Sequence, residues 1–164
     1  MRVYFAADHA GLELKNSLLA FVRDELKFEV EDCGAFTDDK GDDYPALIAS
    51  AARKLSADVV AGKDSRAIIA GASGQGEAIV ANRFKGVRCA LYYGEPGSTQ
   101  KDMSGKELGI VAGSREHNDA NALSLAGRFV SLEDAKQAVK KWLETPFSGE
   151  ERHARRIKQI DEQG

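Results

Sequence analysis

The amino-acid sequence predicts a protein of the α/β class, in which a mostly parallel five-stranded sheet lies between two layers of helices. Short apolar runs of strand type alternate along the chain with longer segments whose apolar residues recur at helical spacing. Alternating units of this length favour parallel strands with helices on both faces of the sheet. The chain has 164 residues, of which 43% are hydrophobic, so we expect one domain over residues 1–164 with a proper core.

Each element has its own signal. Strands are expected where apolar residues run or alternate, and helices where an apolar stripe recurs every three or four residues. Pro45 is well placed to open a helix. On the first helix, Lys15, Arg23 and Asp24 are expected on the solvent side. In chain order we expect a strand at 2–7, a helix from 12, a strand at 28–33, a helix from 45 to about 55, a strand at 66–70, a helix from 77, strands at 87–92 and near 122–126, a helix at 132–143 and a charged helix at 149–162.

The segment 94–113 is the hardest to interpret, and residues 108–112 fit either a strand or a loop that packs on one. The whole arrangement is a three-layer α/β/α, Rossmann-like fold.

Composition excludes several functions. The net charge of −3 provides no basic excess, so nucleic acid is not an expected partner. No apolar run has membrane length and no signal-peptide pattern is present, so we expect a cytoplasmic protein that does not bind membranes. The two cysteines form no C-x-x-C pair, and the three histidines lack metal-ligand spacing, so we expect no metal site.

The segment Ala70-Gly71-Ala72-Ser73-Gly74-Gln75-Gly76-Glu77 joins a buried strand to a helix through a glycine-rich turn. Such a turn points several backbone N–H groups at one spot, where an anion or an oxyanion can bind. Glu77 falls in the first helical turn, at the rim of this cradle. A carboxylate beside an oxyanion site suits the removal of a carbon-bound proton, because the enolate is stabilised as it forms.

The same segment has a plainer interpretation and lacks three known motifs. It can be a simple tight turn in which the glutamate complements the helix dipole. No Lys-Ser/Thr pair follows the last glycine, which excludes a P-loop. The spacing of Gly71, Ser73 and Gln75 breaks the G-x-S-x-G nucleophile elbow, and Ser73 stands where a dinucleotide fingerprint needs its second glycine.

Two histidines lie beside other polar groups. Asp8 and His9 end the first strand, and ligands of such sheets bind beyond the carboxyl ends of the strands. His9 can equally be a cap or a packing residue. His117 and Asn118 form an acid and amide pair suited to a sugar oxygen, or simply belong to a solvated loop.

The last helix carries a basic cluster. Arg152 and Arg156 are four residues apart, so their guanidinium groups lie on one helix face and suit a phosphate or a carboxylate. Pairing with the neighbouring Glu150 and Glu151 is the plainer alternative.

Taken together and in this order, the motifs resemble the ribose-5-phosphate isomerase B family, which also includes galactose-6-phosphate isomerase subunits. The resemblance runs from Val3 to about Ile160. It is carried by Asp8-His9-Ala10-Gly11, Asp32-Cys33-Gly34, Asp43-Tyr44-Pro45, Gly74-x-Gly76, Ala81-Asn82-Arg83, Gly86-Val87-Arg88, Arg115-Glu116-His117-Asn118, Gly127-Arg128 and Arg152-His153-x-x-Arg156.

Two features depart from the common pattern of that family. Many members carry a cysteine base where this chain has Gly71, and a threonine where it has Ser73. The actinobacterial-type branch, with Gly-Gly-Ser-Gly-x-Gly-Glu and a glutamate base, resembles this chain more closely. The chain also has about a dozen more residues than a typical member between its fourth strand and Arg115. This insertion is a lid, an interface element or an inert loop.

The resemblance implies reversible aldose–ketose isomerisation of ribose 5-phosphate and ribulose 5-phosphate through a cis-enediolate, with no cofactor and no metal. It implies Glu77 as the base, His117 opening the sugar ring with help from Asp8, and Ser73 orienting the reacting hydroxyl. The implied substrate contacts are His9, Tyr44, Ala72, Gly74, Gln75, Gly76 and Asn118. The implied phosphate ligands are Arg128, Arg152 and Arg156, together with His9.

The resemblance also implies a homodimer, or a dimer of dimers, with shared active sites. In it His117, Asn118 and Arg128 reach into the neighbour's pocket, and the helix at 149–162 completes the phosphate site or the dimer interface. Two other functions stay open. The insertion favours an isomerase of another sugar phosphate, such as a hexose 6-phosphate or a tetrose phosphate. Gly71 in place of cysteine favours a catalytically inactive sugar-phosphate-binding protein.

Overall fold

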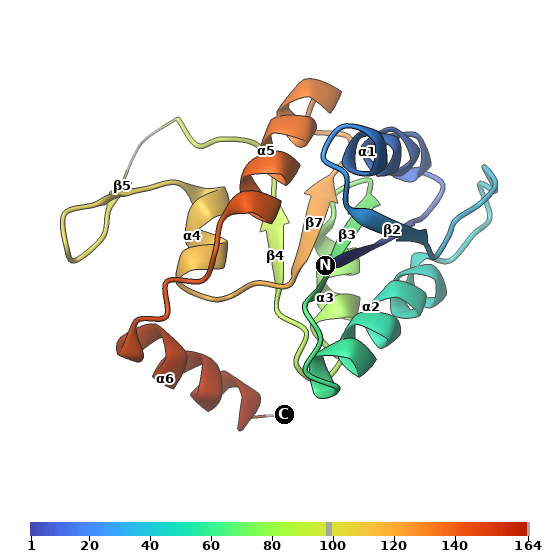
Figure 1. Ribbon diagram of the computed structural model, residues 1–164. Coiled ribbons are helices and arrows are strands. Elements are labelled where there is room, and N and C mark those ends of the chain that lie inside the picture. The colour runs from blue at the N-terminus through green and yellow to red at the C-terminus, as the bar shows by residue number, and fades with distance from the viewer. Residues whose placement is uncertain (98–99, 164) are drawn as a thin grey trace.

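The computed structural model describes residues 1–97 and 100–163, and it places a five-stranded parallel sheet between two layers of helices (Figure 1). The spatial order is β2-β1-β3-β7-β4, and every neighbouring pair is parallel. The predicted three-layer α/β/α fold is confirmed. The strands are β1 (Arg2–Ala7), β2 (Glu29–Asp32), β3 (Ser65–Gly71), β4 (Cys89–Tyr92) and β7 (Ala122–Ala126).

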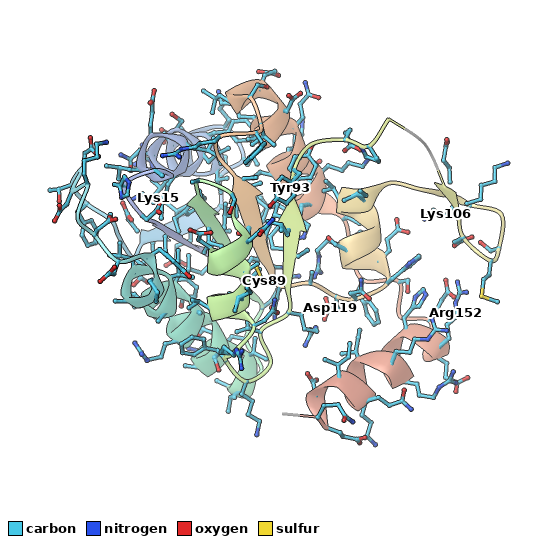
Figure 2. All side chains as sticks on the ribbon, turned by 180° about the vertical axis from the view of Figure 1, so that it is seen from behind. Lys15, Cys89, Tyr93, Lys106, Asp119 and Arg152 are labelled. Atoms are coloured by element: carbon cyan, nitrogen blue, oxygen red, sulfur yellow. The ribbon has the colours of Figure 1, made fainter. Side chains whose placement is uncertain are left out.

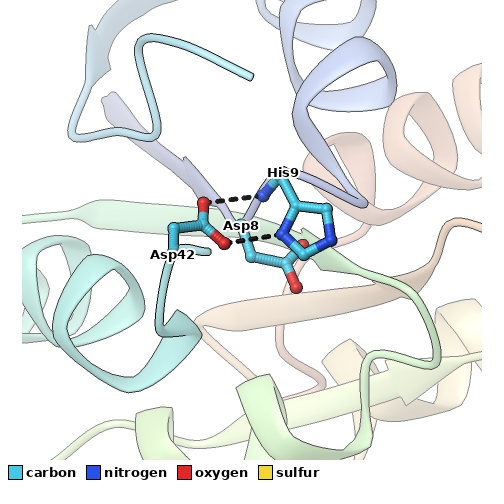
Figure 3. Close-up of side chains that lie close together, drawn as sticks. All are labelled: Asp8, His9 and Asp42. Atoms are coloured by element: carbon cyan, nitrogen blue, oxygen red, sulfur yellow. Dashed lines mark hydrogen bonds and ion pairs between the residues drawn. The ribbon is translucent and has the colours of Figure 1, made fainter. Parts of the chain in front are cut away.

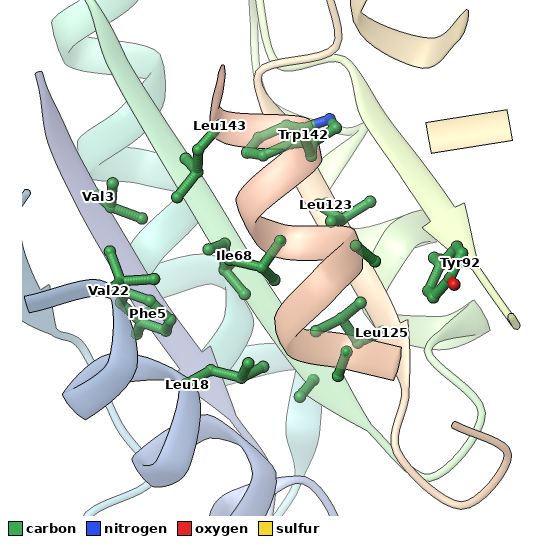
Figure 4. Close-up of a cluster of buried hydrophobic side chains, with 14 of the residues drawn as sticks. Val3, Phe5, Leu18, Val22, Ile68, Tyr92, Leu123, Leu125, Trp142 and Leu143 are labelled. Carbon is green, nitrogen blue, oxygen red and sulfur yellow. The ribbon is translucent and has the colours of Figure 1, made fainter. Parts of the chain in front are cut away.

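The helices divide between the two faces of the sheet. They are α1 (Leu12–Asp24), α2 (Tyr44–Val60), α3 (Gln75–Ala81), α4 (Ile110–Glu116), α5 (Leu132–Glu144) and α6 (Glu151–Asp161). On the face of α1 and α5 the core contains Phe5, Leu18 and Trp142 (Figure 4). On the face of α2 it contains Tyr4 and Ile48. Tyr4 and Phe5 belong to different layers because successive strand residues point to opposite faces.

The order of the strands creates a switch point between β1 and β3. From β1 the chain moves outward to β2, then crosses to β3 on the other side of β1. The connections that leave β1 and β3 therefore diverge, and the carboxyl ends of these strands are where such a sheet has its ligand-binding crevice. Asp8 and Ala72, which directly follow the two strands, border this crevice.

One local prediction is wrong. Residues 108–112 form no strand or loop on the main sheet; instead β5 (Gln100–Lys101) and β6 (Glu107–Leu108) make an antiparallel hairpin, and α4 begins at Ile110. His117 is the C-cap of α4 and begins the turn that follows this helix. The error arises because a seven-residue helix rich in small residues carries too little periodicity to be recognised.

The prediction that Lys15 lies on the solvent side of α1 is also wrong, because Lys15 is buried. Arg23 and Asp24 are exposed, as expected. The Lys15 Nζ atom lies 2.7 Å from both carboxylate oxygens of Asp32 and 2.6 Å from the carbonyl oxygen of Ala35. A buried ammonium requires partners of this kind. The interaction ties α1 to the end of β2.

α6 lies apart from the three layers, beside α4 (Figure 1). His153 is its anchor: the residue is 3% exposed, and its ring centroid lies 4.3 Å from that of His117. Nδ1 of His153 also lies 2.8 Å from Oγ of Ser148. Most of the remaining helix surface is exposed. Among the described residues, no helix combines the length and the hydropathy that a membrane span needs.

Candidate active site

The crevice at the switch point contains the carboxylate that the sequence singles out. Glu77 lies in the first turn of α3 and is 4% exposed, and Asp8 is 8% exposed. Burial raises the pKa of Glu77 above its ordinary value of 4.5; its own backbone N–H opposes this rise, and the charge of Asp8 adds to it. A carboxylate whose pKa is raised is a stronger base toward a carbon-bound proton.

The Glu77 side chain folds back against Gly71. A Cβ on residue 71 would lie 2.0 Å from Oε1 and 2.2 Å from Cδ of Glu77. No side chain fits at position 71 while the carboxylate is there. The carboxyl group of Glu77 therefore lies where the resemblance would put the side chain of a cysteine base.

The turn before α3 presents backbone donors to the crevice. Gly74 has a φ of 72°, which favours glycine, and its carbonyl oxygen accepts a 2.7 Å hydrogen bond from Oγ of Ser124 on β7. In the part of the chain that the structure describes, the amides of Ser73 and Gly74 donate to no other group. They can therefore bind an oxyanion. Because α3 has only seven residues, these amides matter more than the helix dipole.

Tyr44 borders the same turn. A Cβ on Gly76 would lie 2.7 Å from Cζ and from the hydroxyl oxygen of Tyr44. The first residue of α2 thus packs on the first turn of α3, and it adds an aromatic wall beside the amides.

His9 is held by Asp42, a residue that the sequence analysis does not identify (Figure 3). The His9 amide donates to Oδ2 of Asp42 at 2.9 Å, and Nδ1 of His9 lies 2.6 Å from Oδ1. This pairing fixes the imidazole and leaves Nε2 for a ligand. Residues 38–43 contain four aspartates, and no sequence signal shows which of them reaches His9.

Asp8, His9 and Asp42 are the one cluster among the described residues whose ligand atoms, within 4.8 Å of one another, have the spacing of a metal site. Nδ1 of His9 and both oxygens of Asp42 are already hydrogen-bonded to each other. The donor set therefore fits an oriented imidazole better than a set of metal ligands.

Arg128 lies near His9. The two residues line one depression of about 710 Å³ together with Asn16, Asp38 and Lys40. The Arg128 amide donates to the carbonyl oxygen of Ala72 at 3.1 Å, which fixes the loop after β7 beside the turn. Glu13 also lines it, and Nζ of Lys40 lies 2.8 Å from Oδ1 of Asp38, so Arg128 and His9 are the donors that suit a phosphate.

The remaining predicted residues form a second group at another place. His117, Asn118, Arg152 and Arg156 lie at the end of α4 and on α6, and Figure 2 shows Arg152 on the opposite side of the molecule from Lys15. Nε of Arg152 donates to Oε2 of Glu150 at 2.7 Å, which is the plainer pairing considered above. One chain thus holds the predicted site residues in two groups. The crevice group contains Asp8, His9, Tyr44, Arg128 and residues 72–77, and the α6 group contains His117, Asn118, Arg152 and Arg156.

The fold is that of an α/β protein with a parallel sheet, and its switch point brings together features that suit a small anionic ligand. These are the buried carboxylate, the turn amides that donate to no other group among the described residues, and the depression lined by His9 and Arg128. A family model described as Ribose/Galactose Isomerase matches residues 3–160. The chain belongs to this family, as the resemblance of the motifs indicates.

Similar proteins support this assignment. Ribose-5-phosphate isomerase B of Mycolicibacterium paratuberculosis is 39% identical over 157 residues, which cover 96% of this chain and 87% of the relative. The protein of the same name from Escherichia coli is 33% identical over 159 residues, covering 97% and 93%. The crystal structure of ribose-5-phosphate isomerase B from Mycoplasma genitalium with bound ribulose-5-phosphate has a TM-score of 0.82 at 30% identity, covering 99% and 95%.

Proposed function

We propose that this protein interconverts ribose 5-phosphate and ribulose 5-phosphate. One observation carries the proposal: the buried carboxylate of Glu77 lies beside the turn whose Ser73 and Gly74 amides donate to no other group among the described residues. Family membership and a relative whose structure holds ribulose-5-phosphate support it.

In the proposed reaction Glu77 removes the proton from C2 of the aldose and returns it to C1. The cis-enediolate formed in between carries negative charge on oxygen, and the amides of the turn stabilise that charge. Ser73 orients the reacting hydroxyl, and His117 protonates the ring oxygen with help from Asp8. Because the proton moves within one substrate molecule, the proposed reaction needs no cofactor.

In this proposal the α6 group comes from a second copy of the chain. Figure 2 shows Arg152 on the opposite side of the molecule from Lys15, and His117 packs on His153 of α6, which stands beside the three layers (Figure 1). We infer a homodimer in which the α6 group of one protomer completes the crevice group of the other. Arg128 shares its depression with His9 of the same chain, so we assign it to that chain's own site.

An isomerase of another sugar phosphate is the second candidate. The hairpin of β5 and β6 favours it, because Lys106 of this hairpin lies 2.6 Å from Glu116, the residue before His117. A hairpin beside His117 can change the shape of the site and therefore which sugar phosphate fits.

The test is turnover of ribose 5-phosphate by the purified protein with EDTA present, with E77Q and the exposed control E25Q alongside. We expect turnover in the wild type and E25Q, and a loss of about 100-fold or more in E77Q. Full activity of E77Q would contradict the assignment of the base. Turnover of only another sugar phosphate supports the second candidate, and binding without any turnover supports an inactive binding protein.

A further inference from the structure

The hairpin of β5 and β6 is built around one aspartate. Oδ1 of Asp102 accepts hydrogen bonds from the amide of Ser104 (2.8 Å), the hydroxyl of Ser104 (2.6 Å) and the amide of Lys106 (3.0 Å). The hydrogen bond from the Ser104 side chain is the main cause that lowers the pKa of Asp102 below its ordinary value. The carboxylate is therefore ionised and held in place, and its other oxygen, Oδ2, remains for another partner.

Two ion pairs join the hairpin to α4 and to α6. Nζ of Lys106 lies 2.6 Å from Oε2 of Glu116, and Oδ2 of Asp102 lies 3.9 Å from Nη2 of Arg152. Figure 2 shows Lys106 and Arg152 on the same side of the molecule, next to the start of α6. A hollow of about 330 Å³ lies here, lined by Asp102, Lys106, Glu116 and His117 among others. The inserted segment thus reaches the residues that the proposed function assigns to the substrate.

Glu150 and Asp102 both attract the guanidinium group of Arg152, and its Nη atoms stay available as hydrogen-bond donors. Its Nε donates to Glu150, while the 3.9 Å separation from Asp102 is too long for a hydrogen bond and leaves an electrostatic attraction. Within residues 1–97 and 100–163, neither Nη atom of Arg152 donates a hydrogen bond. The side chain is 28% exposed, so these donors remain accessible to an anion.

We propose that Asp102 is a positioning residue that aims the guanidinium of Arg152 at the phosphate group of the substrate. The inference rests on the proposed function, in which Arg152 binds that phosphate. Asp102 acts through Arg152 and touches neither the substrate nor the reacting carbons. The hairpin therefore sets the affinity for the phosphorylated end of the sugar and leaves the proton transfer unchanged.

The size of the effect on phosphate binding follows from the conformational freedom of the Arg152 side chain that Asp102 removes. An arginine side chain that must be immobilised when its ligand binds weakens binding by about 3- to 10-fold. The negative charge of Asp102 also repels a phosphate. That repulsion is the smaller effect, because the guanidinium stands between the two anions and water screens them.

The experiment compares KM and kcat for ribose 5-phosphate, and the inhibition constant of inorganic phosphate, in the wild type, D102N and E107Q. E107Q removes an exposed charge from the same hairpin and serves as the control. For D102N we expect KM and the phosphate constant to rise about 3- to 10-fold with kcat within twofold, and for E107Q no change. An unchanged KM overturns the proposal. A lowered KM also overturns it, because Asp102 would then compete with the phosphate.

A double-mutant cycle separates positioning from a general loss of structure. In an R152A background, D102N should have no further effect on phosphate binding, because the residue through which Asp102 acts is gone. A further loss in the double variant overturns the proposal. If R152A itself binds phosphate normally, the phosphate assignment within the proposed function fails. If R152A is impaired while D102N is not, the role of Asp102 alone fails.

Discussion

Oε1 of Glu77 lies 2.0 Å from the point that a Cβ of residue 71 would occupy. Gly71 and Glu77, six residues apart, therefore form one structural unit: the glycine at the end of β3 makes room, and the glutamate of α3 fills it. The carboxylate at the switch point belongs to a residue of helix α3. A cysteine side chain at residue 71 would reach the same place from strand β3.

The first prediction concerns this contact. In G71A the new methyl group displaces the Glu77 carboxylate, and a displacement of about 1 Å lowers turnover about 100-fold. G97A is the control, because among the described residues no atom beyond its chain neighbours lies within 4 Å of the Cβ that it adds. Near-normal turnover of G71A would show that the position of Glu77 is not critical.

The second prediction concerns pH. Because the pKa of Glu77 is raised, kcat/KM should begin to fall at a pH above that of an ordinary glutamate as the medium becomes acidic. D8N removes a neighbouring negative charge and should move this acid limb to lower pH. An acid limb that is identical in both proteins would show that Asp8 does not influence the base.

The second prediction extends to stability, because the same pKa shift makes the free energy of unfolding depend on pH. A raised carboxyl pKa in the folded state means that folding favours the protonated form, so this contribution is present below the ordinary pKa of 4.5 and is lost as the pH rises through the folded-state pKa. E77Q should therefore melt at a higher temperature than the wild type at pH 7. Near pH 4 the two melting temperatures should converge. A lower melting temperature for E77Q at pH 7 would argue against the raised pKa.

A third prediction concerns Asp42. D42A leaves the His9 ring without the partner of its Nδ1 atom and should raise KM for the sugar phosphate about 10-fold or more. D39A, in the same loop, is the control, because Asp39 contacts Gly41 rather than His9. The measurement is KM for the sugar phosphate in both variants. Equal KM values would exclude the proposal that Asp42 orients the ring of His9.

A fourth prediction tests the shared site. E77Q and H117N carry defects in different groups, so a random mixture of the two refolded together should recover about 25% of wild-type sites. E77Q mixed with S73A, which has its defect in the same crevice group, should recover nothing. Failure of the first mixture to gain activity, with mixed dimers verified, would place both groups in one chain's site.

A fifth prediction concerns stability away from the site. Hydrogen bonds from Ser65 and Tyr4, each 2.7 Å long, lower the pKa of Asp58 to about 2. Asp58 thus stabilises the fold above the unfolded pKa of about 3.9, and the contribution disappears as the pH falls through about 2. D58A should cost about 1–3 kcal/mol in urea unfolding at pH 7, whereas D24A at the surface should cost far less.

The parts of the molecule that follow from local pattern could be predicted. The five strands and the layers come from periodicity, and the turn before Glu77 comes from its glycines. The pairing of Lys15 with Asp32 could not be predicted, because it depends on where two separate elements meet. The same holds for Asp42, which reaches His9 across 33 residues of sequence. The division of the candidate site into two groups is a property of the three-dimensional fold that no local spacing encodes.

Placing an oxygen base in the crevice also affects how the protein meets oxidants. Both cysteines, Cys33 and Cys89, are free thiols outside the crevice, and burial raises their pKa values to about 11 and about 12. Peroxide attacks the thiolate form, which is scarce at such pKa values. The proposed chemistry therefore depends on no sulfur atom. Peroxide should leave the activity of this protein intact at concentrations that inactivate an isomerase with a cysteine base.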